Sequence, residues 1–69
     1  MTLNEWQQRF LLRLAELGGS ITVPVGVANE DLVALIEADY VLESDSGVGQ
    51  TRYEITKGGR TAIKQSLGE

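Results

Sequence analysis

The 69-residue sequence contains no cysteine and no histidine. The absence of cysteine excludes disulfide bonds, thiolate metal sites and cysteine nucleophiles. The absence of histidine removes the commonest general base and the commonest metal ligand at neutral pH. Nucleophilic catalysis needs a base oriented beside Ser, Thr or Cys, and no such constellation stands out. We therefore expect a non-enzymatic protein that uses no cofactor and no metal ion.

Long hydrophobic runs are also lacking. No stretch approaches the roughly 20 apolar residues of a membrane span. The first residues, Met1 to Glu5, do not combine a basic region with an apolar core, so we expect no signal peptide. Because small secreted domains usually need disulfides, the sequence predicts a cytoplasmic protein.

The residues that are present fit one small globular domain covering residues 1–69. Hydrophobic residues make up 42% of the chain and charged residues 23%, as in an ordinary globular domain. The net charge of −4 is unevenly distributed. Residues 1–48 hold two basic against eight acidic residues, a net of −6, whereas residues 49–69 hold four against two, a net of +2. This separation of acidic and basic residues along the chain is more informative about binding partners than the net charge is.

A first helix is predicted to begin at Thr2. Thr2 and Glu5 have the spacing of a capping box, with Thr2 as the N-cap, and Glu5 and Arg9 form a favourable i,i+4 pair. The pair Gly18-Gly19 should end the helix, because glycine tolerates a left-handed backbone. Apolar residues recur between them at spacings of three and four, which predicts a buried stripe made of Leu3, Trp6, Phe10, Leu14 and Leu17.

A short strand and a second helix should follow. Residues 20–25 are rich in β-branched side chains. Because proline cannot donate a ladder hydrogen bond, Pro24 predicts that this strand lies at a sheet edge or ends there. Asn29 can cap the second helix, which is predicted to end near Asp39. Its buried face is predicted to hold Leu32, Leu35 and Ile36, with Val33 on the margin.

The next two segments have the pattern of a β-hairpin. Residues 40–43 and 50–55 are β-rich, and the turn-rich residues 45–49 lie between them. Alternation in the second strand points Tyr53 and Ile55 inward. It points Arg52 and Glu54 outward.

A last helix is predicted from Lys57 to about Leu67, with Thr56 as its cap. It should bury Ala62, Ile63 and Leu67. Gly58 and Gly59 weaken its first turn, by about 1 kcal/mol each relative to alanine. Such glycines indicate that something packs closely against them.

These elements predict an α+β fold with the order α-β-α-β-β-α and helices packed on a small antiparallel sheet. We expect truncation of Trp6 or Phe10 to alanine to cost about 3–5 kcal/mol. The predicted core consists of Trp6, Phe10, Leu14, Leu17, Ile21, Leu32, Leu35, Ile36, Tyr40, Tyr53, Ile55 and Ile63.

The order of elements and three local patterns resemble winged-helix domains of bacterial transcription regulators, of the MarR and PadR type. Residues 32–41 are similar to the end of a recognition helix that runs into the first wing strand. Residues 45–50 are similar to a wing tip, and residues 55–60 to the turn that opens the helix after the wing. The resemblance implies a winged-helix-like fold and, by analogy, a DNA-binding regulator that is commonly dimeric.

The sequence departs from that family between its first two helices. A full winged helix has another helix before the recognition helix, and only residues 20–28 are available here. They are too few and too β-branched for a helix and a turn. The helix-turn-helix half of the motif is therefore reduced or missing.

The outward face of the second helix argues against DNA recognition by this helix. At 100° per residue it carries three carboxylates and no basic residue, which phosphate groups would repel. Two alanines at its centre leave a flat patch that could dock on a basic protein partner. The candidate protein-binding residues are Glu30, Asp31, Ala34, Glu37 and Ala38. A solvated, structurally neutral helix face is the other interpretation of the same residues.

Two functions follow as hypotheses. The first is a protein-interaction module on a winged-helix scaffold, such as a small acidic accessory or inhibitor protein of the kind that phages and other mobile elements encode. The alternative is a winged-helix regulator, possibly a homodimer, that contacts double-stranded DNA through the wing and the last helix. Its candidate DNA-binding residues are Arg52, Lys57, Arg60 and Lys64. These cations could instead serve solubility and the helix C-terminus.

Overall fold

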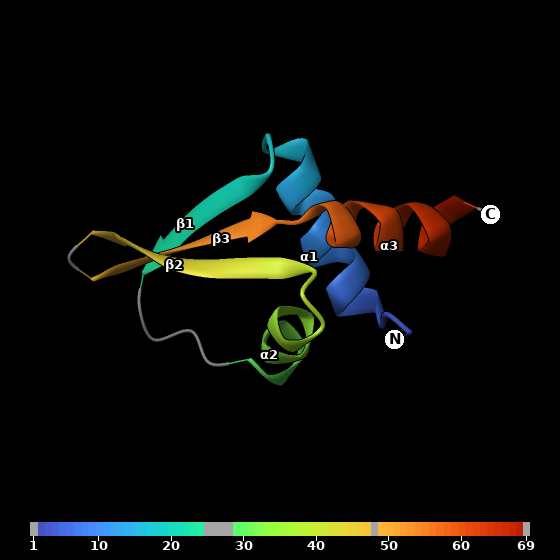
Figure 1. Ribbon diagram of the computed structural model, residues 1–69, viewed down its shortest axis with the longest axis horizontal. Coiled ribbons are helices and arrows are strands. Elements are labelled where there is room, and N and C mark those ends of the chain that lie inside the picture. The colour runs from blue at the N-terminus through green and yellow to red at the C-terminus, as the bar shows by residue number, and fades with distance from the viewer. Residues whose placement is uncertain (1, 25–28, 48, 69) are drawn as a thin grey trace.

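The computed structural model describes residues 2–24, 29–47 and 49–68 and has the α+β architecture that the sequence predicts, with three helices on a small three-stranded antiparallel sheet (Figure 1). The order of the elements is α-β-α-β-β-α, as predicted. The elements are α1 (Glu5–Glu16), β1 (Ser20–Pro24), α2 (Glu30–Glu37), β2 (Val41–Gly47), β3 (Gln50–Ile55) and α3 (Lys57–Gly68).

Helix α1 begins two residues later than predicted. Its N-cap is Asn4, whose Oδ1 accepts a hydrogen bond from the backbone N–H of Gln7 at 2.8 Å. The Gln7 Oε1 in return accepts from the Asn4 N–H at 2.9 Å, which completes a capping box. The predicted box of Thr2 and Glu5 is therefore wrong. Glu5 instead pairs with Arg9, Oε2 to Nη2 at 2.8 Å, as predicted.

The buried side of α1 is rotated relative to the predicted stripe. Trp6 and Leu17 are 37% and 50% exposed, so their assignment to the core is wrong. The buried residues of the helix are Gln7, Leu11 and Leu14. Gln7 can be buried because its side-chain amide forms hydrogen bonds there. Its Nε2 donates to the backbone carbonyl of Asp31 at 3.1 Å. A pattern based on apolar residues alone does not detect this polar core position.

The sheet has the strand order β1-β3-β2, and both pairings are antiparallel. β1 is thus an edge strand that ends at Pro24, which confirms the edge placement; the predicted last residue, Val25, lies outside the described residues. Tyr53 and Ile55 face inward and are buried, whereas Arg52 and Glu54 are exposed on the other face, as predicted.

The hairpin strand β2 is longer than predicted. It runs to Gly47, and Asp45 still pairs with Thr51. A register shift between Asp45 and Gly47 marks a β-bulge, which absorbs one extra residue beside the turn. The predicted turn, residues 45–49, therefore begins too early, because residues 45–47 still belong to β2.

Local signals at the other helix ends are confirmed. Gly18 and Gly19 follow α1 with φ of 89° and 111°. Asn29 caps α2, because its Oδ1 accepts from the backbone N–H groups of Asp31 and Leu32 at 2.8 and 3.2 Å. Helix α2 ends at Glu37, two residues before Asp39.

The first turn of α3 packs closely, as its glycines predict. Thr56 Oγ1 accepts from the Gly59 N–H at 2.9 Å and so caps the helix. A Cβ atom on Gly59 would collide with the carbonyl oxygen of Tyr40 and lie 2.9 Å from Cγ1 of Ile55. At Gly58 the same atom would have no neighbour nearer than 3.6 Å. The close approach therefore belongs to Gly59 alone.

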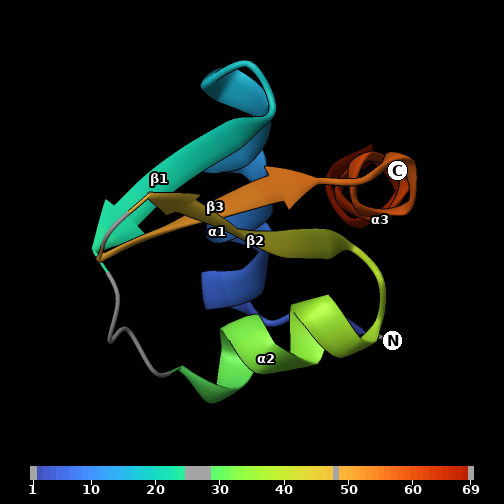
Figure 2. The same cartoon turned by 60° about the vertical axis from the view of Figure 1, so that its left-hand side comes forward.

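The core lies between the inner face of the sheet and the helices. In Figure 2, α1 crosses behind the sheet, α2 runs beside β2, and α3 continues beyond the end of β3. Phe10, Ile21, Ile36 and Tyr40 pack against this core but are only partly buried, as is Ala62. The predicted burial of Leu67 concerns a side chain outside the part of the chain that the structure describes. The buried hydrophobic residues are Leu3, Leu11, Leu14, Leu32, Leu35, Val41, Tyr53, Ile55 and Ile63.

Candidate protein-binding surface

A shallow groove lies along the outward face of α2. Its volume is about 420 Å³, and it is lined by Asn29, Glu30, Val33, Ala34 and Glu37. We call this surface the α2 groove. Its lining residues are spaced by three and four along the chain, so they stand on one side of the helix. Four of them belong to α2, and the fifth is its N-cap.

The sequence of α2 produces this groove because its two sides differ. Leu32 and Leu35 are buried against the core, which turns the opposite side of the helix to solvent. Val33 is 49% exposed there and forms, with the half-buried Ala34, an apolar floor. The apolar pattern predicts Val33 on the margin of the buried face and does not identify it as part of a surface. Its position beside Glu30 and Glu37 on a helical wheel is the signal that could have found it.

Two carboxylates border the apolar floor. Glu30 and Glu37 are exposed and seven residues apart, which separates their backbone positions by about 10 Å along the helix axis. None of the residues that line the groove is basic. The α2 groove therefore offers an apolar strip with a negative charge at each end.

Two of the predicted binding residues lie elsewhere. The carboxylate of Asp31 accepts a hydrogen bond from Asn4 Nδ2 at 2.8 Å, which braces α2 against the start of α1. Asp31 is half-buried, and it does not line the groove. Ala38 is the C-cap of α2, is half-buried, and also lies outside the lining. Of the five predicted residues, the structure brings together Glu30, Ala34 and Glu37.

The predicted DNA-binding residues lie outside the α2 groove, on β3 and α3, and are called the basic band below. Arg52 lies on the outer face of the sheet, and its Nη2 donates to Ser20 Oγ at 3.3 Å. Arg60 of α3 reaches the same turn, because a Cβ atom on Gly19 would lie 3.0 Å from its Nη2. Lys57 and Lys64 are exposed on α3. Two arginines from the consecutive elements β3 and α3 thus converge on the connection between α1 and β1.

An acidic residue interrupts this basic band. Glu54 is exposed on the same face of β3 as Arg52, two residues away. Strand alternation places both side chains outward, so a polyanion lying over Arg52 would also meet the Glu54 carboxylate.

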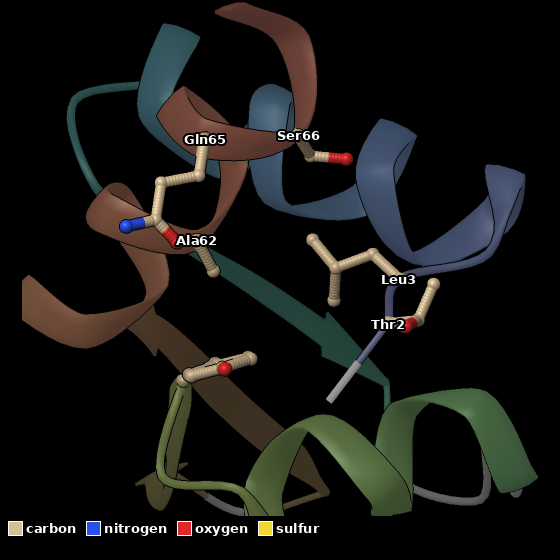
Figure 3. Close-up of a pocket in the computed structure, with 6 residues that line it drawn as sticks. Thr2, Leu3, Ala62, Gln65 and Ser66 are labelled. Atoms are coloured by element: carbon tan, nitrogen blue, oxygen red, sulfur yellow. The ribbon is translucent and has the colours of Figure 1, made fainter. Parts of the chain in front are cut away.

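A second, smaller pocket lies between the start of the chain and α3. It has a volume of about 220 Å³, and Figure 3 shows Leu3 on one side of it and Ala62 of α3 on the other. None of the lining residues is charged at neutral pH, so the pocket offers hydroxyl, amide and apolar groups but no ion pair. The lining consists of Thr2, Leu3, Tyr40, Ala62, Gln65 and Ser66.

Tyr53 has a raised pKa. Burial raises the pKa of the Tyr53 hydroxyl, and the hydrogen bond that it donates to Glu43 Oε2 at 3.1 Å raises it further. The ring packs edge-on against Phe10, at 6.2 Å between ring centroids, so this tyrosine belongs to the core. Among the described residues, no three acidic side chains gather closely enough to hold a metal ion.

Comparison with known proteins gives no relative: no protein-family model, curated protein or solved structure matches this chain. Within the described residues, none of the helices has the length and apolar character needed to cross a membrane.

Proposed function

We propose that this chain is a non-enzymatic protein-interaction module on a winged-helix-like scaffold, and that it binds a partner through the α2 groove. The observation that carries the proposal is the groove itself, an apolar floor of Val33 and Ala34 between the carboxylates of Glu30 and Glu37. Exposed apolar patches with a polar rim are typical of binding sites. The absence of cysteine from the sequence supports a cytoplasmic setting for this interaction.

The partner that fits this surface carries basic residues around an apolar side chain. Opposite charge at both ends of the groove would steer the approach and fix the register of the complex. The small side chain of Ala34 lets a partner backbone come close. A small acidic accessory or inhibitor protein would use such a surface against a basic protein.

The experiment uses synthetic helical peptides as probes. One peptide carries two lysines seven residues apart around a leucine, and its control has glutamine in place of both lysines. We expect the lysine peptide alone to bind, measured by fluorescence anisotropy. The variant Glu30→Lys/Glu37→Lys should lose this binding.

A matched variant separates the groove from the net charge. Glu16 and Glu54 are exposed and lie outside the α2 groove. The variant Glu16→Lys/Glu54→Lys has the same net charge as the groove variant, and it should still bind the lysine peptide. Equal loss of binding in both variants would show that total charge, and not the groove, holds the peptide.

DNA binding is the second candidate function, favoured by the convergence of Arg52 and Arg60 on the turn before β1. With Lys57 and Lys64, they provide four cations outside the acidic helix. Affinity for duplex DNA comes largely from such phosphate contacts and falls steeply with salt. Two copies of the chain on one duplex would double the number of contacts.

A titration with random-sequence duplex DNA tests this candidate. If the basic band is a DNA-binding surface, binding should be visible at ~50 mM salt, fall steeply at ~200 mM, and weaken in the variant Arg52→Ala. No binding at the lower salt concentration rejects the candidate.

A further inference from the structure

The exposed face of α3 repeats the spacing of the α2 groove with the opposite charge. In α2, Glu30, Ala34 and Glu37 occupy positions i, i+4 and i+7. In α3, the same positions are held by Lys57, Thr61 and Lys64, and all three are exposed. Each helix therefore presents two like charges about 10 Å apart along its axis, with a small residue between them.

We propose that the α2 groove of one molecule binds α3 of a second copy of this chain. The inference rests on the proposed function, since it uses the same groove and names the partner. The charge pattern argues for this occupant, because the basic partner that the groove requires is present within the chain itself.

An antiparallel arrangement of the two helices fits best. It places Glu30 opposite Lys64 and Glu37 opposite Lys57 of the second copy. The positive end of the α2 dipole then lies near the negative end of α3, which is favourable. Val33, which is half exposed in the single molecule, would be covered by the middle of α3.

The four charged residues are available for this contact. Among the described residues, the ion pair that forms within one molecule joins Glu5 to Arg9 and involves none of them. Helices α2 and α3 also lie apart in the molecule, so they cannot satisfy each other within one copy (Figure 2). Their pairing requires a second molecule.

The association should be weak and sensitive to salt. Exposed ion pairs contribute little in water, and their attraction is screened as the ionic strength rises. We expect the average mass to increase between about 10 µM and about 1 mM protein, the range of a weak complex. The increase should disappear when salt rises from about 0.05 M to about 0.5 M.

The test is sedimentation equilibrium of the full chain and its charge variants. Glu30→Lys/Glu37→Lys and, separately, Lys57→Glu/Lys64→Glu should each weaken self-association about tenfold or more, because each makes both helix faces alike in charge. The control Glu16→Lys/Glu54→Lys, with the net charge of the first variant, should associate like the wild type. Circular dichroism confirms that each variant is folded.

A mixture of the groove variant Glu30→Lys/Glu37→Lys and the α3 variant Lys57→Glu/Lys64→Glu is the decisive sample. The lysine-rich α3 of the first variant matches the intact α2 of the second, so mixing should restore a complex that neither forms alone. The variant that carries all four reversals keeps the wild-type net charge and should also self-associate. If the wild type stays monomeric, or if the mixture does not associate, the proposal is overturned.

The outcomes also separate this inference from the proposed function. A monomeric wild type that still binds the lysine peptide through Glu30 and Glu37 overturns self-association alone. A wild type that neither self-associates nor binds the peptide overturns both.

Discussion

At the residue scale, Gly59 sets how closely α3 approaches the turn that follows α2. Its Cα faces the carbonyl group of Tyr40, and that carbonyl also accepts a hydrogen bond from the Thr56 N–H at 3.0 Å. A methyl group at this position would collide with backbone, which cannot move as freely as a side-chain end. The neighbouring Gly58 has ordinary contact distances and therefore provides a matched control.

We predict that Gly59→Ala lowers the free energy of unfolding by about 1–3 kcal/mol, the usual range for overpacking. Gly58→Ala should leave it unchanged or raise it by up to about 1 kcal/mol, because alanine favours a helix. Urea unfolding of the two variants measures both effects. Equal stability of the two variants would show that α3 does not pack on the Tyr40 carbonyl as described.

Tyr53 couples stability to alkaline pH. Its pKa is raised in the folded state, by burial first and then by Glu43, so the folded protein holds this proton more tightly than the unfolded chain. The stabilising contribution is fully present below the unfolded pKa of about 10 and is lost as the pH rises through the folded pKa.

We therefore predict that stability falls above about pH 10 in the wild type, and falls less in Tyr53→Phe. Near pH 8 this variant should be less stable by about 1 kcal/mol, because the hydrogen bond to Glu43 is lost. Urea unfolding near pH 8 and above about pH 10 measures the stability of both proteins, and tyrosinate absorbance follows the loss of the tyrosine proton. An unchanged alkaline profile in Tyr53→Phe would assign the pH dependence to other groups.

At the scale of single elements, the residues that cap α1 also hold α2 in place. Asn4 caps α1 through Oδ1, and its Nδ2 bonds Asp31 of α2. Gln7 closes the capping box and also bonds the carbonyl of Asp31. The same two residues, Asn4 and Gln7, thus cap α1 and bond to α2, the helix that carries the groove.

Asn4→Ala should cost about 1–2 kcal/mol, at the upper end for an N-cap because the link to α2 is lost as well. Thr2→Ala should have little effect on stability, although its spacing from Glu5 predicts a cap. Thermal unfolding compares the two variants. A larger loss in Thr2→Ala would contradict the start of α1 described above.

A second prediction for α1 concerns which of its side chains stabilise the core. Leu11 is fully buried, so Leu11→Ala should cost about 2–5 kcal/mol. Trp6 is 37% exposed and stacks on Phe10 at 5.1 Å. Its truncation to alanine should cost less, on the order of 1 kcal/mol. A reversed order in urea unfolding would restore the stripe predicted from the sequence.

The sequence predicts the elements better than their faces. Caps and glycines act locally, so Asn29, Thr56 and the pair Gly18-Gly19 locate helix ends without tertiary information. The buried side of α1 could not be found this way, because Gln7 is buried through partners distant in the sequence. The same limit applies to Asp31. A helical wheel assigns it to the acidic face of α2, but its hydrogen bond with Asn4 of the α1 cap holds it outside the groove.

The candidate site was predictable to a similar degree. Glu30, Ala34 and Glu37 follow from helical spacing within one element, and the structure brings them together. The convergence of Arg52 and Arg60 requires the sheet register and the path of α3, which no local pattern contains. The groove floor also depends on Val33, whose exposure is decided by which leucines face the core.

At the scale of the whole molecule, the charge separation along the chain becomes a separation in space. The acidic α2 and the basic α3 lie on different sides of the fold (Figure 1). The proposed partners differ accordingly, a basic helix at α2 and an anion or a second copy at α3. We propose that the α2 groove is the surface that binds a basic helical partner.

An NMR titration of labelled protein with the lysine peptide tests whether the peptide occupies the α2 groove. We predict that backbone amide shifts change along α2, at Glu30, Val33, Ala34 and Glu37, and stay constant at Arg52 and Arg60. The glutamine peptide should leave the spectrum unchanged. Shift changes confined to the sheet or α3, or no change with the lysine peptide, would contradict the assignment of the α2 groove as the binding surface.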